Sequence, residues 1–148
     1  MPNALTFEVA SSEAFYEIKH FLKRNQTHSA NRGDKIYIVR NHLKLIGVAR
    51  LLPVEDSPTT FWLRGLFVES AWRKQGIASQ LLEHIANQEK SNREIKMIAA
   101  FAEPHLLKFY QRNHYTETAI TNLPDSLKQR IEQAQSQGKT WRCLQITL

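Results

Sequence analysis

The sequence predicts a mixed α/β fold in which one sheet is covered by helices. Apolar runs of strand length alternate with amphipathic segments of helical periodicity along the 148 residues. Near the middle, an apolar run ending at Val68 is followed by a polar turn, Gly76, a helical segment and a second apolar run. Because this is the order of a crossover connection, we expect its two strands to be parallel. No repeat, low-complexity tract or linker interrupts the chain, so residues 1–148 are expected to form one domain.

The first half of the chain is expected to consist mainly of strands. Ser11 or Ser12 can cap a first helix, whose apolar residues recur at helical spacing as far as Leu22. Residues 25–34 are polar and indicate a loop or a weak helix, and residues 55–60, with prolines nearby, indicate a second loop. A tight hairpin is expected at 40–42, although it lacks the preferred glycine. The expected strands are Thr6–Val9, Ile36–Val39, Leu43–Leu52 and Phe61–Val68.

The second half is expected to be richer in helices. The helix after Gly76 reaches about Asn92 and carries apolar residues at 77, 78, 81, 82, 85 and 86, which predicts that one face packs on the sheet. A later helix begins near Asp125 and is closed by Gly138. The other expected elements are a buried strand Ile95–Ala102, a short helix Pro104–Arg112, a strand Tyr115–Ile120 and a final strand Trp141–Leu148.

Composition limits the class of protein and its location. The single cysteine, Cys143, has no partner for an internal disulfide, and the N-terminus has no basic leader, so a cytoplasmic protein is expected. The longest apolar run, residues 97–102, is far shorter than the roughly 20 residues that a membrane span requires. The net charge of +6 favours anionic partners such as phosphorylated cofactors, but the basic residues are scattered, which also fits an ordinary solvated surface.

The segment Leu66–Gln80 predicts an anion-binding turn. It joins the apolar strand to the amphipathic helix through Arg73-Lys74-Gln75-Gly76. The first amides of a helix lack intrahelical partners and carry partial positive charge. Gly76 has no Cβ and lets a phosphate approach the backbone, while Arg73 and Lys74 add full charges. The turn lacks the further glycines of a dinucleotide fingerprint and the Gly-Lys-Ser/Thr end of a P-loop.

The order Val68, four residues, then Arg73-x-x-Gly76-Ile77-Ala78 resembles the Arg/Gln-x-x-Gly-x-Gly/Ala motif of the GNAT superfamily of N-acetyltransferases. The order of elements resembles that family from end to end, and residues 109–115 (FYQRNHY) resemble its F-Y-x-x-x-G-F segment. Three departures stand out: His114 replaces the usual glycine, Glu103 stands where many members have asparagine, and the helix over 125–137 is longer than usual. The resemblance implies a mostly antiparallel sheet, a splayed parallel pair around an acetyl-coenzyme A site, and helices on both faces.

The resemblance also implies which residues hold the coenzyme. Backbone amides of one strand end would bind the acetyl and pantetheine portions, and the turn with the first helical residues would bind the pyrophosphate. The strand residues are Leu66, Phe67 and Val68, and the turn residues are Arg73, Lys74, Gln75, Gly76, Ile77, Ala78 and Ser79.

Tyr110 is the residue that the resemblance nominates as the acid that protonates the departing thiolate. A phenol has an ordinary pKa of about 10 and keeps its proton at neutral pH. The alternative is a core tyrosine on the apolar face of its helix. Glu103 and His105 follow the strand that should diverge from 61–68, so either can serve as the base; the alternatives are a carboxylate at a helix N-terminus and a surface imidazole.

Trp62 and Arg64 are the candidate acceptor-binding residues. They share one strand face with Leu66 and can meet an acceptor that carries an acidic group; the alternative is that Trp62 packs in the core and Arg64 reaches solvent. The six histidines have no metal-ligand spacing, and Cys143 has no second thiol nearby, so no metal is expected.

The function expected from these features is transfer of an acetyl group from acetyl-coenzyme A to a primary amine of a small molecule or protein, by direct attack in a ternary complex. The family is compatible with a homodimer, and a membrane partner is not expected. One alternative is a nucleic-acid-binding module, suggested by the charge of +6 and by three tryptophans. Another keeps the fold and the coenzyme without catalysis, as a sensor of acetyl-coenzyme A.

Overall fold

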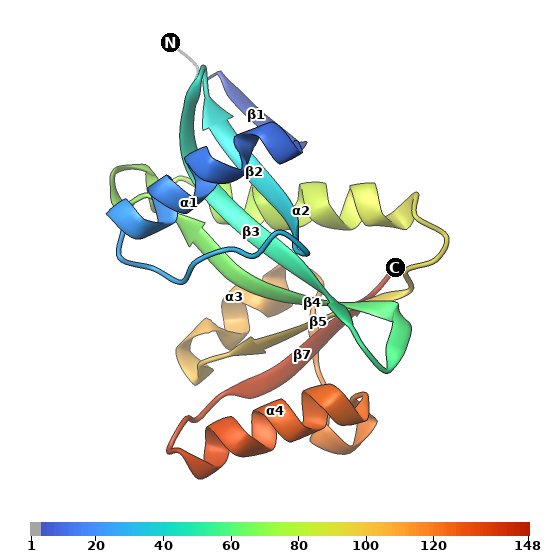
Figure 1. Ribbon diagram of the computed structural model, residues 1–148. Helices are drawn as coiled ribbons and strands as arrows, with labels where there is room; N and C mark the ends of the chain where they lie inside the picture. The colour runs from blue at the N-terminus through green and yellow to red at the C-terminus, as the bar shows by residue number, and fades with distance from the viewer. Residues whose placement is uncertain (1–3) are drawn as a thin grey trace. The chain divides into compact units, whose positions relative to one another are not determined.

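The computed structural model describes residues 4–148; residues 1–3 of the expected domain lie outside the described part. Its strands form one seven-stranded sheet in the order β1-β2-β3-β4-β5-β7-β6 (Figure 1). The strands are β1 (Leu5–Val9), β2 (Lys35–Asn41), β3 (Lys44–Val54), β4 (Ser57–Val68), β5 (Met97–Ala102), β6 (Thr116–Glu117) and β7 (Arg142–Thr147). The α-helices are α1 (Phe15–Arg24), α2 (Ile77–Lys90), α3 (Leu107–Arg112) and α4 (Asp125–Ser136).

The predicted crossover is confirmed. β4 and β5 are parallel and are joined through α2, whereas β1–β2, β2–β3, β5–β7 and β6–β7 pair antiparallel. The pairing of β4 with β5 extends from Thr60 opposite Met97 to Leu63 opposite Ala100. The mixed sheet with one parallel pair and helices on both faces is therefore the fold class that the sequence predicts.

The chain groups into two compact units, each described by itself below. Unit 1 contains the residues up to Leu52 and Arg64–Ile85, and unit 2 contains Pro53–Leu63 and Ala86–Leu148. β4 and α2 therefore each contribute residues to both units. The expectation that the whole chain is a single domain stays a prediction.

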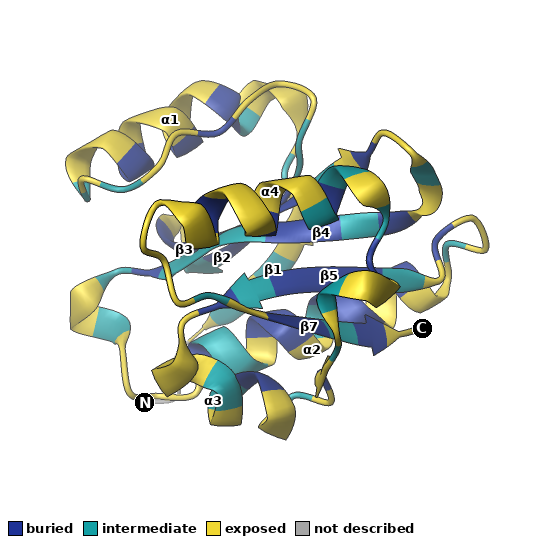
Figure 2. Ribbon diagram, turned by 90° about the horizontal axis from the view of Figure 1, so that it is seen from below, coloured by how far each residue is buried: buried dark blue, intermediate teal, exposed yellow. Residues whose placement is uncertain are grey.

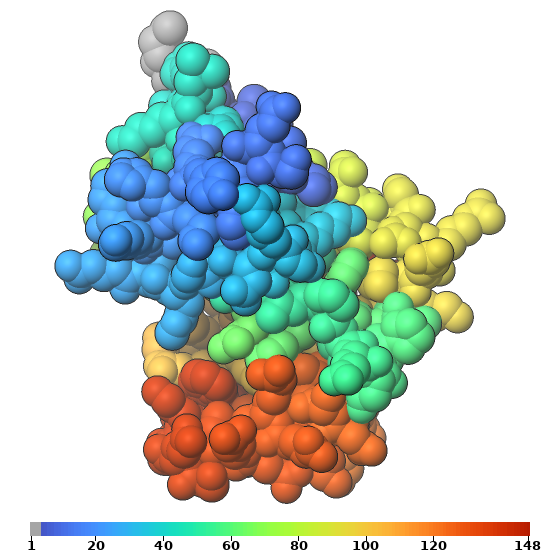
Figure 3. All heavy atoms as spheres, viewed as in Figure 1, coloured from blue at the N-terminus to red at the C-terminus, as the bar shows by residue number. Residues whose placement is uncertain are grey.

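In unit 1, the sheet carries a helix on each face. The alternation of side chains along β2 points Ile38 toward α1 and Val39 toward the opposite face, where Ile77 of α2 packs. The buried residues of α1 are Phe15, Ile18, Phe21 and Leu22, as its helical spacing predicts. Figure 3 shows α1 and the chain that follows it, in blue, covering one face of this unit.

In unit 2, α4 and α3 lie on opposite sides of β5 and β7 (Figure 2). α4 buries Leu127, Ile131 and Ala134, the three residues that the sequence pattern places on one face. Its first turn is held by Asp56, whose carboxylate accepts hydrogen bonds from the Ser126 amide (3.0 Å) and hydroxyl (2.5 Å). Gly138 follows the helix with a φ of +89°, as expected for a residue that ends it.

The loop expected at 55–60 is wrong. β4 already begins at Ser57, so that only Glu55 and Asp56 separate it from β3. Pro53 and Pro58 lie inside the two strands and are exposed near the hairpin end. Prolines are tolerated at such positions because a missing N–H there costs little of the hydrogen-bond ladder.

Two smaller expectations are also wrong. α1 begins at Phe15 after a 3-10 turn at Ser12–Ala14, and neither Ser11 nor another side chain caps it; instead the Ala14 amide bonds to the Ser11 carbonyl at 3.1 Å. The strand expected at 115–120 shortens to Thr116–Glu117, because the chain turns into a 3-10 helix at Ile120–Asn122. The β2–β3 hairpin forms where expected, and His42 takes the positive φ (+55°) that a glycine usually supplies.

Candidate functional site

The turn between β4 and α2, in unit 1, has the geometry of an anion site. After Val68 the chain makes a 3-10 turn at Ser70–Trp72, and α2 begins at Ile77. The first helical hydrogen bond runs from the Gln80 amide to the Gly76 carbonyl at 3.0 Å. The amides of Ile77 and Ala78 therefore have no helical carbonyl one turn before them, and they lie at the positive end of the helix.

Gly76 leaves the space in front of these amides open. Its φ is +77°, and a Cβ built on it would meet no heavy atom within 4 Å. Lys74, two residues earlier, also has a positive φ of +63°. The turn thus fits a phosphate group that approaches the backbone closely, as the sequence predicts.

Arg73 fixes the turn to the end of β4. Its Nε donates a hydrogen bond to the Val68 carbonyl at 2.7 Å, and its guanidinium carbon lies 5.1 Å from the centre of the Phe67 ring. The same side chain places a full positive charge beside the helix start. Gln75 makes only a long contact, from its side-chain amide to the Ala71 carbonyl at 3.5 Å.

The last residues of β4 are anchored through their side chains. Phe67 packs against Phe21 of α1 with ring centres 5.9 Å apart, and Val68 lies in the cluster on the other face with Ile77. Beyond them, the Glu69 amide bonds to the Ile46 carbonyl of β3 at 2.8 Å. These contacts anchor Phe67, Val68 and Glu69 at the end of β4, which favours the proposed amide contacts to a coenzyme.

The strand bends just before this segment. Gly65 has a φ of +64°, and a Cβ on it would stand 2.8 Å from Nε of Arg50. It lies two residues after Leu63, the last residue of β4 that pairs with β5. The positive φ of Gly65 thus lies just beyond the end of the pairing with β5 along the chain.

The acidic residue nearest in sequence to the turn is paired with cations. The Glu69 carboxylate forms two ion pairs: its Oε2 lies 3.7 Å from Nη2 of Arg24, and its Oε1 lies 3.5 Å from Nζ of Lys44. These contacts offset the carboxylate charge next to the helix start. The electrostatic field at the turn is therefore dominated by Arg73, Lys74 and the helix amides.

Tyr110 lies in unit 2 and is the buried residue of α3, with 7% of its surface exposed. Its ring meets those of Phe109 and Tyr115 edge-on, at centre distances of 5.2 and 5.4 Å. Burial raises the pKa of the Tyr110 phenol to about 12, so the group keeps its proton at neutral pH. A protonated phenol fits the acid role, and its packing equally fits the core alternative. His114, in place of the family's glycine, adopts a φ of +73° just after this helix.

Glu103 and His105, also in unit 2, lie together at the surface. The His105 Nδ1 is 3.6 Å from a Glu103 carboxylate oxygen. The side chain of His105 is 71% exposed, and that of Glu103 is 54% exposed. Glu103 precedes the 3-10 turn Pro104–Leu106, and its side chain does not cap that turn. The structure thus brings the two candidate bases into contact, and their catalytic role stays a prediction.

Trp62 is buried in unit 2, with 5% of its surface exposed. Its ring lies 5.2 Å from that of Phe101, and the guanidinium carbon of Arg130 stands 5.1 Å from it. Sequence reasoning did not select Arg130, although its place three residues after buried Leu127 puts it beside the apolar stripe of α4. Arg64 belongs to unit 1, and the acceptor role of both predicted residues stays a prediction.

The part of the chain that the structure describes contains neither a cluster of metal ligands nor a membrane-spanning helix. Among residues 4–148, no group of three or more His, Cys, Asp or Glu side chains is arranged to hold a metal ion. Within the same part of the chain, no helix has the length and apolarity needed to cross a bilayer.

A mixed sheet with one parallel crossover and an open turn at the start of the crossover helix defines an α/β protein. Residues 32–117 match the family described as "Acetyltransferase (GNAT) domain". That match covers more than half of the chain, and the protein belongs to the GNAT acetyltransferase family. No curated protein sequence is significantly similar to this chain.

Solved structures share the fold at low sequence identity. A GNAT family acetyltransferase from Elizabethkingia anophelis with acetyl-CoA bound is 16% identical, with a TM-score of 0.67 over 99% of this chain and 100% of that one. Arabidopsis thaliana Naa50, in complex with the bisubstrate analogue CoA-Ac-MVNAL, is 14% identical, with a TM-score of 0.66 over 98% and 99%. N-acetylglutamate synthase from Neisseria gonorrhoeae, complexed with coenzyme A and N-acetyl-glutamate, is 14% identical, with a TM-score of 0.71; the match covers all of this chain but only 36% of that protein.

Proposed function

We propose that this protein is an N-acetyltransferase that moves the acetyl group of acetyl-coenzyme A to a primary amine of a small molecule or protein. The observation that carries the proposal is the open, positively charged turn at Arg73–Gly76, found in a chain of the GNAT acetyltransferase family. Its residues suit the pyrophosphate of the coenzyme, because the first amides of α2 follow a turn that carries two cationic residues, Arg73 and Lys74. The single cysteine favours a reducing cytoplasm as its location.

The proposed reaction is a direct attack in a ternary complex. The amine nitrogen forms a bond to the carbonyl carbon of the thioester, and the carbon–sulfur bond breaks. The nitrogen loses a proton to a base, and the sulfur takes a proton from an acid, so no covalent acetyl-enzyme is needed. The coenzyme supplies the activated acetyl group, and the protein supplies positioning, proton transfer and charge stabilisation.

Each step has a proposed residue. Backbone amides of Leu66–Val68 would position the acetyl arm and donate to the carbonyl oxygen, a contribution commonly worth roughly 3 to 4 kcal/mol in rate. Residues Arg73–Ser79 would bind the pyrophosphate. Tyr110 is the proposed acid, and Glu103 or His105 is the proposed base.

The acceptor is proposed at the level of its reacting group. Structures with this fold have been solved with N-acetyl-glutamate and with a peptide bisubstrate analogue, so the fold is compatible with both small and peptide amines. Trp62 and Arg64 are the proposed acceptor contacts, and they would favour an acceptor that also carries an acidic group. A homodimer is compatible with this function.

A thiol-release assay tests the proposal. Acetyl-coenzyme A would be mixed with the protein and a panel of amino acids, polyamines and peptides with unblocked N-termini, and each product would be analysed by mass spectrometry. We expect release of coenzyme A thiol only with an amine present, together with a mass increase of one acetyl group on nitrogen. Acetylation of hydroxyl acceptors only, or coenzyme binding without turnover over the whole panel, would contradict the amine-transfer proposal.

A further inference from the structure

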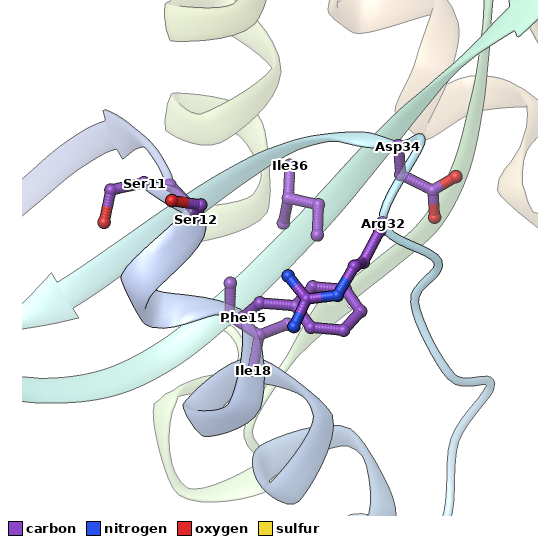
Figure 4. Close-up of a pocket in the computed structure, with 8 residues that line it drawn as sticks. Ser11, Ser12, Phe15, Ile18, Arg32, Asp34 and Ile36 are labelled. Atoms are coloured by element: carbon purple, nitrogen blue, oxygen red, sulfur yellow. The ribbon is translucent and has the colours of Figure 1, made fainter.

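Unit 1 contains a cavity whose lining includes none of the turn residues 73–79. It has a volume of about 180 Å³ and opens between the start of α1 and the segment that leads into β2. Residues 10–12, two α1 side chains and three residues at 32–36 line it (Figure 4). The walls therefore come from two chain segments whose positions are fixed by the sheet, because the Ala10 amide bonds to the Ile36 carbonyl at 2.8 Å.

Arg32 supplies the charge of this cavity. Its guanidinium carbon lies 4.4 Å from the centre of the Phe15 ring and 5.2 Å from that of Tyr16. In Figure 4 its side chain extends across the opening, so that the guanidinium group lies over Phe15. A guanidinium stacked by its flat face keeps its N–H groups at the edge, where they can form paired hydrogen bonds with a carboxylate. Among residues 4–148, no carboxylate forms an ion pair with Arg32.

The acid in the cavity wall is already neutralised. Asp34 accepts hydrogen bonds from the Asn31 amide and from Nη1 of Arg50, both at 2.9 Å, and the side chains of Asp34 and Arg50 are each 5% exposed. This buried pair fixes the loop that carries Arg32. It also removes the charge that would otherwise repel an anion, so the charge left to a ligand is the positive charge of Arg32.

The remaining walls are apolar and set the size of the ligand. Phe15, Ile18 and Ile36 contribute hydrocarbon surface, and Ser11 and Ser12 at the rim add polar groups. The cavity volume is about 180 Å³, and an engineered cavity of about 150 Å³ in another protein holds benzene, which has six heavy atoms. A ligand with about six or seven heavy atoms therefore fits.

We propose that this cavity binds a small organic carboxylate with a short branched or unbranched hydrocarbon chain. The carboxylate bonds to the guanidinium edge of Arg32, and the hydrocarbon chain packs on Phe15, Ile18 and Ile36. The site does not depend on the proposed acetyl transfer, and its test does not use turnover. A ligand of this size binds weakly, with a dissociation constant on the order of 1 mM.

The test is a titration of the ¹⁵N-labelled protein with 3-methylbutanoate, followed by amide chemical shifts. We expect saturable shifts in residues 10–18 and 31–36. The neutral isostere 3-methylbutanamide should bind at least about tenfold more weakly, because the charge-assisted hydrogen bonds to Arg32 are missing. Inorganic phosphate should also bind more weakly, because it leaves the apolar walls uncovered.

Two variants make the test specific. Arg32→Gln should weaken binding of 3-methylbutanoate about tenfold or more, whereas Arg93→Gln, which removes an equal charge from an exposed position in unit 2, should leave it unchanged. The dispersion of the amide spectrum shows whether each variant is folded. Equal binding of acid and amide, unchanged binding in Arg32→Gln, or no saturable shifts at these residues up to 20-fold the expected constant of about 1 mM would overturn the proposal.

Discussion

Arg73 serves two purposes at once, and the two respond differently to mutation. Its Nε bond to the Val68 carbonyl and its stacking on Phe67 fasten the turn to β4, while its charge adds to the field of the helix start. The helix amides themselves do not depend on this side chain. We therefore expect the proposed anion site to be only partly removed when Arg73 is lost.

We predict that Arg73→Ala weakens binding of coenzyme A about tenfold without abolishing it, since the backbone amides survive the substitution. Loss of the hydrogen bond to Val68 should also lower the free energy of unfolding by about 1 kcal/mol. Calorimetric titration and urea unfolding measure the two effects, with Arg93→Ala as the control for net charge. Unchanged coenzyme affinity in Arg73→Ala would remove this residue from the site.

Tyr115 is a matched control for the proposed catalytic role of Tyr110. Both tyrosines are buried, and their rings are in contact. We predict that Tyr110→Phe lowers kcat at least tenfold with little change in coenzyme affinity, as expected for a general acid. Tyr115→Phe should leave kcat near the wild-type value. Because the pKa of Tyr110 is about 12, its phenol stays protonated below about pH 10. We therefore expect that ionisation of Tyr110 does not lower the wild-type activity in that range.

Normal turnover by Tyr110→Phe would assign Tyr110 to the core and leave water to protonate the thiolate. A large loss of stability in that variant would instead mean that the hydroxyl is a buried hydrogen-bonding group. Circular dichroism and urea unfolding distinguish these outcomes from a loss of catalysis.

The observed helices and strands agree with the prediction wherever the apolar pattern extends over many residues. The buried face of α1 and that of α4 contain the residues expected from helical spacing, and the crossover through α2 makes β4 and β5 parallel. The nearby prolines predict a loop at 55–60, but β4 begins at Ser57 because an exposed strand end accepts proline. The length of a strand depends on its pairing with a neighbouring strand, and the local sequence does not specify that pairing.

The start of α4 illustrates a contact between distant segments within unit 2. Asp56 and Ser126 are 70 residues apart in the chain, yet Asp56 accepts both the amide and hydroxyl hydrogen bonds of Ser126. The hydrogen bonds from the Ser126 side chain and backbone lower the pKa of Asp56 below its usual value of 3.8. The β3–β4 turn is therefore joined to the first turn of α4.

We predict that Asp56→Asn lowers the melting temperature at pH 7, because the amide cannot accept both bonds as a carboxylate does. The folded-state pKa is depressed, so the stabilisation by Asp56 is present above the unfolded value of 3.8 and is lost as the pH falls through the folded value. The difference between wild type and variant should therefore shrink at pH 3 and below. Glu132→Gln, on the exposed side of α4, is the control; an equal effect of that variant would contradict the role of the contact.

For the whole molecule, the sequence predicted the fold class and the open turn at Gly76, since both depend on local motifs and their order, and the binding of an anion at this turn stays a prediction. It did not predict the Asp34–Arg50 pair, the position of Arg32 over Phe15, or that of Arg130 over Trp62. Each of these contacts joins residues far apart in the chain, and ordinary surface spacing gives no sign of them. Sites that depend on such contacts can be recognised only in the tertiary structure.

The stability of the whole molecule should fall in alkaline solution. Burial raises the pKa of Tyr110 to about 12, and burial together with Tyr110 raises that of Tyr115 above its ordinary value. The folded state therefore holds these protons more tightly than the unfolded state, whose phenols ionise near pH 10. The contribution of the two protonated phenols to the free energy of unfolding is therefore complete below about pH 10. It declines as the pH rises toward 12. Urea unfolding between pH 8 and 11.5 measures this decline, and a steady value across that range would contradict the burial of the two phenols.

Coenzyme binding by Gly76→Glu is the most direct test of the anion site, and Gly138→Glu is its matched control. Both glycines have a positive φ, and a Cβ on either would meet nothing within 4 Å, so the two substitutions carry similar backbone strain. Only at Gly76 would the new carboxylate occupy the position proposed for the pyrophosphate. We expect calorimetric titration with acetyl-coenzyme A to detect binding to the wild type and Gly138→Glu, and none to a folded Gly76→Glu. Wild-type affinity in Gly76→Glu would show that the coenzyme does not bind at this turn.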